Sequence, residues 1–361
     1  MNSRIRIAVL LIIVATTGAA MGVFLLNSQP DEINVGPASN KDKEVELTKV
    51  AENLEVPWSV VFYGETALVS LRNSGQIIEL ADNGSYRLIG TVPGAVHRDE
   101  GGLLGLAIDD QQRLYAYYTT ELDNQVARFE LNGEPGSLSL GESEIIIKGL
   151  PSGSTHNGGR IAFGPDNLLY VTVGDARNTE GAQDLSILSG KILRMTPDGD
   201  VPEGNPFSDS LVYSYGHRNP QGIAWSDDGT MYSTEFGQNT WDELNVIEAG
   251  SNYGWPIVEG IAKRDGFVDP VQQWNPNKAS PSGMAYANGL LYIANLRGEV
   301  LRTVPVNDLD ESKEFYSGKY GRLRDVVSAP DGRIWFVTNN TDGRGEPGRK
   351  DDRIFSIPTV E

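Results

Sequence analysis

The chain has 361 residues, of which 39% are hydrophobic, enough apolar material for a large core. Its 49 acidic and 30 basic residues give a net charge of -19, which argues against binding to nucleic acid, whose phosphates need Lys and Arg. Cysteine is absent, which excludes disulfides, thiolate metal sites and a cysteine nucleophile.

The N-terminal segment has the pattern of an export signal. Two arginines precede an uncharged apolar stretch over residues 7–26, which is long enough to span a bilayer. We expect residues 1–26 to be a signal peptide or an N-terminal membrane anchor, with the anchor favoured, and residues 27–43 to be a polar linker. The folded part, residues 44–361, is then predicted to lie outside the cytoplasm, at the periplasmic or extracellular face.

A recurring unit indicates a repeat architecture. It consists of a polar turn with Asp, Asn or Gly, joined to alternating apolar segments that are rich in aromatic residues. The copies begin at Val61, Ala107, Phe163, Trp225, Tyr286 and Ser328. Six units about 40 to 60 residues apart predict an all-β fold, a six-bladed β-propeller of four-stranded antiparallel blades. Segments 45–51 and 353–357 are also strand-like, and we expect them to pair and close the ring.

Two residues in loops after strand-like segments suggest acid–base chemistry. His156 lies in the Gly-rich run SGSTHNGGR, and Asp175 follows the next strand in VGDARN. An aspartate beside a histidine fixes the tautomer of the ring and stabilises the imidazolium, so the pair would suit a general base. The alternative is structural: His156 would bond a turn carbonyl and Asp175 would cap a turn. For His217 we favour the structural role.

The placement of the scarce basic residues suggests an anion pocket. Arg322 and Arg324 lie two residues apart, so a strand would place them on one face. With Arg218 and Arg297 from neighbouring repeats, they could hold a multiply charged anion, because guanidinium groups bind carboxylates at two points. Alternatively, each arginine pairs with a nearby surface carboxylate.

Other motifs are weaker or missing. The turn at Gly237 is followed by Asp242 and Glu243, and carbonyl and carboxylate oxygens of this kind suit Ca²⁺. The sequence contains no zinc pattern, P-loop, Rossmann glycine fingerprint or GxSxG motif. These absences argue against nucleotide phosphoryl transfer, nicotinamide redox chemistry and the common serine hydrolases.

Taken together, several motifs resemble a known family. They are EGGLLGLA from Glu100, HNGGRIAFGPD from His156, GHRNPQGIAW from Gly216, DELNVIEAGSNYGWP from Asp242 and RLRDV from Arg322. The chain resembles the soluble aldose sugar dehydrogenases that use pyrroloquinoline quinone (PQQ), in the glucose/sorbosone dehydrogenase family, from about Asn53 to near the C-terminus. The resemblance implies a six-bladed propeller that oxidises the C1 of aldoses to the lactone. An external acceptor, a quinone or a cytochrome, would take the electrons, with the N-terminal segment as a possible membrane tether.

The resemblance also implies roles for individual residues. His156 would be the general base for hydride transfer to PQQ, and Asp175 would orient it. Arg218 and Asn219 would contact the quinone carbonyls. The remaining cofactor residues would be Arg322 and Arg324, which match carboxylate-binding arginines, and Arg297, where many relatives have lysine.

The same resemblance implies two Ca²⁺ sites and a sugar contact. One Ca²⁺ would bind backbone oxygens of Gly237 and Gln238, although Gln238 replaces the proline of the family turn. A second would bind Glu243 and the carbonyl of Tyr253. Glu100 matches a glutamine at the sugar site and would bind a sugar hydroxyl.

Two other function classes stay open for this sequence. One is a calcium-dependent propeller hydrolase such as a lactonase, in which side-chain oxygens converge on one central metal ion. The other is a non-catalytic propeller that binds glycans or proteins through its rim. The arginine set fits the hydrolase poorly, and the binding propeller would have no need of His156.

Overall fold

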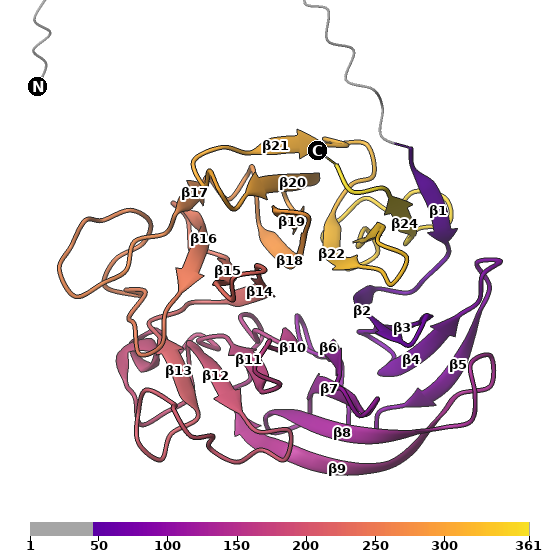
Figure 1. Ribbon diagram of the computed structural model, residues 1–361, viewed down its shortest axis with the longest axis horizontal. Helices are drawn as coiled ribbons and strands as arrows, with labels where there is room; N and C mark the ends of the chain where they lie inside the picture. The colour runs from indigo at the N-terminus through magenta and orange to yellow at the C-terminus, as the bar shows by residue number, and fades with distance from the viewer. Residues whose placement is uncertain (1–45, 361) are drawn as a thin grey trace, which may run out of the picture. The chain divides into compact units, whose positions relative to one another are not determined.

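The computed structural model of the protein describes residues 46–360. Six separate sheets, each of four antiparallel strands, form blades around a common centre (Figure 1). The predicted all-β, six-bladed propeller is therefore confirmed. The predicted N-terminal segments 1–26 and 27–43 lie outside the described residues. Among residues 46–360, the structure contains no helix with the length and apolar character needed to cross a membrane.

The first three blades follow each other along the chain. Blade 1 contains β2 (Pro57–Tyr63), β3 (Thr66–Leu71), β4 (Gln76–Leu80) and β5 (Tyr86–Thr91). Blade 2 contains β6 (Leu103–Ile108), β7 (Leu114–Thr119), β8 (Asn124–Asn132) and β9 (Ser139–Leu150). Blade 3 contains β10 (Ile161–Phe163), β11 (Leu169–Val173), β12 (Lys191–Met195) and β13 (Val212–Tyr215), with the 3-10 helix η1 (Thr179–Gln183) between β11 and β12.

The last three blades repeat this plan, and the sixth takes one strand from the N-terminal side. Blade 4 contains β14 (Pro220–Trp225), β15 (Met231–Glu235), β16 (Asp242–Ile247) and β17 (Gln272–Trp274). Blade 5 contains β18 (Pro281–Ala287), β19 (Leu290–Asn295), β20 (Val300–Pro305) and β21 (Lys313–Phe315). Blade 6 contains β22 (Leu323–Ser328), β23 (Ile334–Thr338), β24 (Ile354–Ile357) and β1 (Thr48–Ala51).

The six sequence repeats mark the first hairpin of every blade, because the polar turn joins the innermost strand to its neighbour. In blade 6, for example, the turn that contains Asp331 and Gly332 joins β22 to β23. The ring closes as expected: β1 pairs with β24, with Thr48 opposite Ser356. Figure 1 shows this closing strand at the outer edge of the C-terminal blade.

Apolar side chains fill the space between neighbouring blades, whereas polar side chains from the inner strands meet near the centre. The buried ring of Trp58 lies between two guanidinium groups, 4.4 Å from that of Arg160 and 5.7 Å from that of Arg324. Arg160 also pairs with Asp325 at 3.0 Å. These cation–π contacts and the ion pair join blades 1 and 6 to the start of blade 3 and give the arginines near the axis a fixed position.

Phe336 in blade 6 offers a test of the packing between blades. Its side chain is fully buried and lies against Tyr316 and Phe355, with ring centroids 5.6 and 5.4 Å away. We expect Phe336→Ala to lower the free energy of unfolding by about 3–5 kcal/mol, because a cavity replaces the ring. Urea denaturation measures the loss. The control is Leu122→Ala, at a side chain that is 90% exposed, and an equal loss in both variants would contradict the packing argument.

Candidate active site

His156 and Asp175 form a hydrogen-bonded pair between two loops of blade 3. His156 lies in the loop that enters β10, and Asp175 follows the end of β11. The Nδ1 atom of His156 is 2.7 Å from Oδ1 of Asp175, and their side chains are 15% and 0% exposed. An ionised Asp175 can only accept, so Nδ1 carries the proton and Nε2 of the ring is left free to accept another. The pair therefore has the arrangement of a base and the carboxylate that orients it.

The backbone holds His156 in an unusual conformation. Its φ angle is 62°, in the left-handed region that few non-glycine residues adopt. The N–H of His156 donates to Oε2 of Glu100 at 3.0 Å, and its carbonyl accepts from the N–H of Ala176 at 3.1 Å. A Cβ atom on Gly174 would lie only 1.9 Å from that carbonyl oxygen, so this position requires glycine. The loop is thus built to present the ring in one orientation.

Asp175 also joins the pair to a tryptophan from blade 4. Its Oδ2 accepts from Nε1 of Trp255 at 2.9 Å, and its Oδ1 accepts from the N–H of Arg177 at 2.8 Å. Burial alone would raise the pKa of Asp175, but the hydrogen bonds from His156, Arg177 and Trp255 outweigh burial and lower it. The carboxylate is therefore ionised at neutral pH.

Arg218 and Asn219 lie beside this pair and carry donors without partners. The guanidinium of Arg218 lies 5.4 Å from the ring of Trp255 and donates through Nη1 to the carbonyl of Phe236 at 3.0 Å. Asn219 is fully buried, and its Oδ1 accepts from the N–H of Gly158 at 2.9 Å. Nε of Arg218 and Nδ2 of Asn219 are buried and have no hydrogen-bond partner among residues 46–360. Unpaired buried donors are costly, so both atoms are suited to the oxygens of a ligand.

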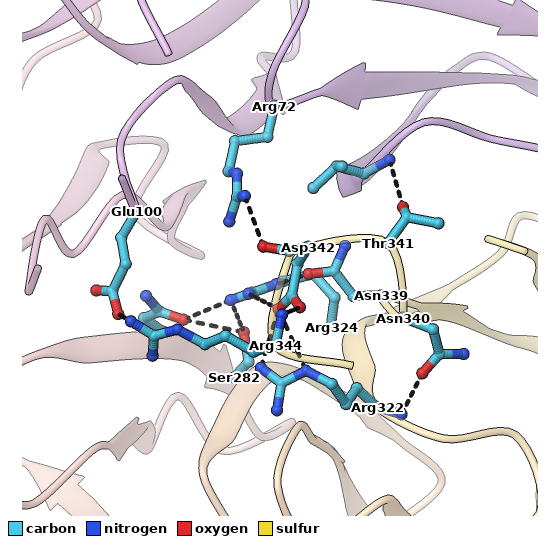
Figure 2. Close-up of polar contacts among 12 residues, drawn as sticks. Arg72, Glu100, Ser282, Arg322, Arg324, Asn339, Asn340, Thr341, Asp342 and Arg344 are labelled. Atoms are coloured by element: carbon cyan, nitrogen blue, oxygen red, sulfur yellow. Dashed lines mark hydrogen bonds and ion pairs between the residues drawn. The ribbon is translucent and has the colours of Figure 1, made fainter. Parts of the chain in front are cut away.

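Arginines from several loops gather around one carboxylate, as Figure 2 shows. Oδ2 of Asp342 is 2.9 Å from Nη2 of Arg322 and 3.8 Å from Nη2 of Arg324. The carbonyl of Asp342 accepts from Nη2 of Arg72 at 3.3 Å. Arg324 is further fixed by Oδ1 of Asn339 at 3.0 Å. The predicted pair Arg322 and Arg324 thus comes together on one face, with a carboxylate partner that the sequence did not indicate.

The charge of this group is unbalanced. Burial lowers the pKa of Arg72 and of Arg324, and the neighbouring arginines lower both further, although Asp342 opposes the shifts. A fourth guanidinium, that of Arg344, pairs with Oε1 of Glu100 at 2.6 Å. The four arginines therefore face the two carboxylates of Asp342 and Glu100, and an added anion would relieve their mutual repulsion.

Glu100 joins the arginines to the base. One of its oxygens pairs with Arg344, and the other accepts the N–H of His156. Its predicted role at the sugar site stays a prediction. Arg297 is exposed in the turn that follows β19, and its guanidinium forms no hydrogen bond or ion pair with any residue in the range 46–360.

Sequence reasoning missed Arg72, Trp255, Asp342 and Arg344. Trp255 belonged to a quoted motif, yet its bond to Asp175 joins residues 80 positions apart. The run TDGRG, which contains Asp342 and Arg344, is a polar Gly-rich loop after the last inner hairpin, in the same kind of position as VGDARN. That parallel was the available signal for the missed residues.

Three of the four predicted metal-ligating residues, Gly237, Glu243 and Tyr253, border one cavity of about 10 Å³, which is about the size that holds a single water. Glu235 also borders it and lies opposite Glu243 in the pairing of β15 with β16. Burial, and then the charge of Glu235, raise the pKa of Glu243 to about 8. A cation in the cavity would stabilise the ionised carboxylate. Even so, no group of three His, Cys, Asp or Glu side chains arranged to hold a metal occurs in residues 46–360.

Gln238 is placed differently, because its N–H donates to Glu259 at 2.7 Å and it does not border the cavity. His217 has the structural role that we favoured. It is fully buried, bonds Glu235 at 2.9 Å and Ser214 at 2.8 Å, and stacks on Tyr253 with ring centroids 4.7 Å apart.

A comparison with protein families gives the same result as the geometry. The family model described as Glucose / Sorbosone dehydrogenase matches residues 54–345. The chain belongs to this family. The resemblance that the motifs indicated is therefore confirmed over most of the folded part.

Individual members of the family are similar to this chain. Aldose sugar dehydrogenase YliI of Escherichia coli is 28% identical, over 83% of this chain and 91% of that protein. Quinoprotein glucose dehydrogenase B of Acinetobacter calcoaceticus is 31% identical over 66% of this chain, which spans 57% of that longer protein. The structure of the PQQ-bound form of aldose sugar dehydrogenase from Streptomyces coelicolor is 44% identical, covers 87% of this chain and 98% of that chain, and has a TM-score of 0.83.

Glu243 makes the stability of the metal-free protein depend on pH. Its pKa is raised from 4.5 to about 8 in the folded state, so its protonated form favours folding, and stability falls as the pH rises between these values. We expect Glu243→Gln to remove this loss, so that the Tm of the variant exceeds that of the wild type at pH 8 by more than at pH 5. Thermal unfolding in EDTA measures the difference, with exposed Glu142→Gln as the control. A Tm difference that does not vary with pH would contradict the assignment.

Proposed function

We propose that the protein oxidises aldose sugars at C1 to the aldonolactone, with PQQ as its cofactor and His156 as the general base. The observation that carries this proposal is the position of the His156–Asp175 pair beside two buried donors without partners, on Arg218 and Asn219. The names of the similar proteins, two of which refer to a quinoprotein and to bound PQQ, support the same conclusion.

The residues of the site fit PQQ, a flat quinone with three carboxylates. Nε of Arg218 and Nδ2 of Asn219 would donate to its carbonyl oxygens, for which each has a free hydrogen. Arg322 and Arg324 would bind its carboxylates. Their side chains are almost buried, and the two positive charges share one negative partner, Asp342, so part of the positive charge is left for the cofactor. Arg72 would add positive potential from within the group, and Arg297 from the exposed turn that follows β19. A local excess of cations is needed to attract a trianion to a protein of net charge -19.

His156 would accept the proton of the sugar C1 hydroxyl at Nε2. PQQ supplies the two-electron acceptor that receives the hydride from C1. As the ring of His156 becomes an imidazolium, the ionised Asp175 stabilises it across the 2.7 Å hydrogen bond without taking the proton. Trp255 holds the second oxygen of Asp175, so the carboxylate cannot rotate away. Arg218 and Asn219 would stabilise negative charge at the acceptor oxygens.

Glu100 would bind a sugar hydroxyl. Each carboxylate oxygen has two lone pairs, and the contacts with Arg344 and with the N–H of His156 use only one on each. A hydroxyl bound there would lie next to the base, because Glu100 accepts a hydrogen bond from the backbone N–H of His156. Arg344, whose side chain is 59% exposed, would border the entrance on the sugar side.

Ca²⁺ would bind at the cavity bordered by Gly237, Glu243 and Tyr253 and at the turn formed by Gly237 and Gln238. The raised pKa of Glu243 is the supporting observation, since a buried carboxylate facing Glu235 gains most from a nearby cation. The backbone oxygens of a tight turn are ligands that Ca²⁺ prefers. The ion would stiffen the segment that follows Phe236. Because the carbonyl of Phe236 accepts a hydrogen bond from Arg218, this would also hold the guanidinium in place.

We further propose an extracytoplasmic location, with residues 1–26 as the export signal or anchor and a quinone or cytochrome as the electron acceptor. The charge pattern of that segment supports export. A tether would keep the enzyme close to an acceptor in the membrane.

Reconstitution tests the proposed function directly. Purified protein is incubated with PQQ and Ca²⁺, and dye reduction is followed with a panel of aldoses that includes glucose and xylose. We expect reduction that requires both PQQ and sugar. Hydrolysis of lactones without any sugar oxidation would instead favour a hydrolase, and sugar binding without turnover would favour a binding propeller.

Loss of the imidazole tests the base. We expect His156→Ala to lower kcat for sugar oxidation by about 10²–10⁴-fold, the usual contribution of a positioned general base, and to leave the Kd for PQQ nearly unchanged. Stopped-flow reduction of bound PQQ and a PQQ titration measure the two quantities. His97→Ala, at another histidine in a loop, is the matched control, and full activity of His156→Ala would refute the assigned role.

Removal of the paired arginines tests the cofactor pocket. We expect Arg322→Ala combined with Arg324→Ala to weaken PQQ binding by about 100-fold or more, since at least two charge-assisted hydrogen bonds of about 1.5–3 kcal/mol each are lost. Equilibrium titration measures the Kd, and circular dichroism checks the fold. Arg349→Ala, at an exposed arginine outside the group, is the control. An unchanged Kd in the double variant would remove these residues from the cofactor site.

A further inference from the structure

A lysine that the proposed reaction does not use is buried in blade 3. Lys191 is the first residue of β12, and its side chain is 0% exposed. Its ammonium donates to the carbonyl oxygens of Ser189 at 2.6 Å, Gly181 at 2.9 Å and Ala182 at 3.1 Å. Within residues 46–360 it forms no ion pair with a carboxylate. The buried charge is therefore balanced by three carbonyl dipoles, as a small bound cation would be.

All three carbonyls belong to the connection between β11 and β12. The carbonyls of Gly181 and Ala182 lie in η1, and that of Ser189 lies just before β12, so the ammonium ties the two ends of residues 181–189 together. Burial lowers the pKa of Lys191 to about 8, although the charge of Asp184 opposes the shift. Without the ammonium, three carbonyl oxygens would converge on an empty space and repel one another.

The tied segment holds Trp255 through Gln183. Nε2 of Gln183, the last residue of η1, donates to the carbonyl of Trp255 at 2.6 Å. The amide groups of Gln183 and Asn252 also exchange two hydrogen bonds, of 3.0 and 2.8 Å. Trp255 in turn donates its indole N–H to Asp175. A continuous path of direct contacts therefore joins Lys191 to the carboxylate that orients His156.

The same segment also holds the loop that carries the unpaired donors. The carbonyl of Ala182 accepts from Lys191 and, in addition, from the N–H of Gly216 at 2.9 Å. Gly216 begins the loop 216–219, which contains Arg218 and Asn219. The carbonyl of Gly216 accepts from the N–H of Trp255 at 2.9 Å, so the path through Gln183 and the path through Ala182 meet at this hydrogen bond.

We propose that Lys191 is a positioning residue, whose ammonium serves as a built-in cation that organises the segment behind the active site. It fixes Trp255, and through Trp255 the orientation of Asp175, while the shared Ala182 carbonyl fixes the loop of Arg218. The inference rests on the proposed function only in that Asp175 is taken to orient the base. The geometric part, that Lys191 sets the position of the Trp255 indole, stands separately.

The test uses Lys191→Met in the full chain, which keeps the length of the side chain and removes its charge. We expect the indole N–H resonance of Trp255 to shift or broaden in spectra of protein labelled with ¹⁵N-tryptophan, with Trp255→Phe assigning the signal. We also expect kcat to fall by about 10–100-fold, the cost of misplaced catalytic groups, with a much smaller change in KM. Lys148→Met, at an exposed lysine on β9, is the control and should change none of these quantities.

Chemical rescue separates the missing cation from a general loss of stability. In Lys191→Ala, n-propylammonium matches the atoms that were removed, so we expect it to restore the Trp255 signal and kcat in a saturable manner. Tetramethylammonium, which cannot donate hydrogen bonds, should not. If Lys191→Met does not fold, rescue of folding and of the indole signal in the alanine variant supports the proposal, and failure of rescue overturns it.

A Lys191→Met variant with an unchanged indole signal and unchanged kcat would also overturn the inference. Failure of the proposed function has a different signature: the wild type with PQQ and Ca²⁺ would oxidise none of the aldoses, while the indole signal of the Lys191 variants would still report on positioning. The two failures are therefore distinguishable.

Discussion

The site depends on one buried carboxylate, that of Asp175. It accepts the imidazole N–H of His156 and the indole N–H of Trp255, which lie in different blades, and the hydrogen bonds keep it charged despite burial. Such a group is stable only where hydrogen-bond donors face its oxygens, so its presence requires the loops around it to keep their conformations. The steric need for glycine at residue 174 and the left-handed backbone of His156 both follow from this requirement.

A second constraint is electrostatic. An acidic protein gathers arginines at one place, where the carboxylate of Asp342 contacts two of them directly and its carbonyl contacts a third (Figure 2). Asp342 therefore organises the group without neutralising it. In the proposed function, a bound anion balances the remaining positive potential. Because Asp342 holds the arginines together only in part neutralised, they can fold without the cofactor and still attract it.

The fold could be predicted from the sequence because it repeats: the turn and strand pattern of the first hairpins recurs along the chain. The closing strand could be predicted because a strand-like segment precedes the first repeat and another follows the last. The pairing of His156 with Asp175 could also be anticipated, because both lie in loops of one blade. Asp342, Arg72 and Trp255 could not, since their roles come from contacts between blades that no local pattern encodes. Arg297 was grouped with the other arginines by its charge and by the family resemblance; its side chain is exposed, and its role stays a prediction.

The closure of the ring by β1 and β24 has a consequence for biosynthesis. Blade 6 takes one strand from residues near the start of the folded part and three from its end, so it cannot be completed until nearly the whole chain has been made. Until then β1 has no strand to pair with, and an open strand edge can pair with other chains. A nascent or truncated chain therefore carries a risk of aggregation that the finished molecule avoids.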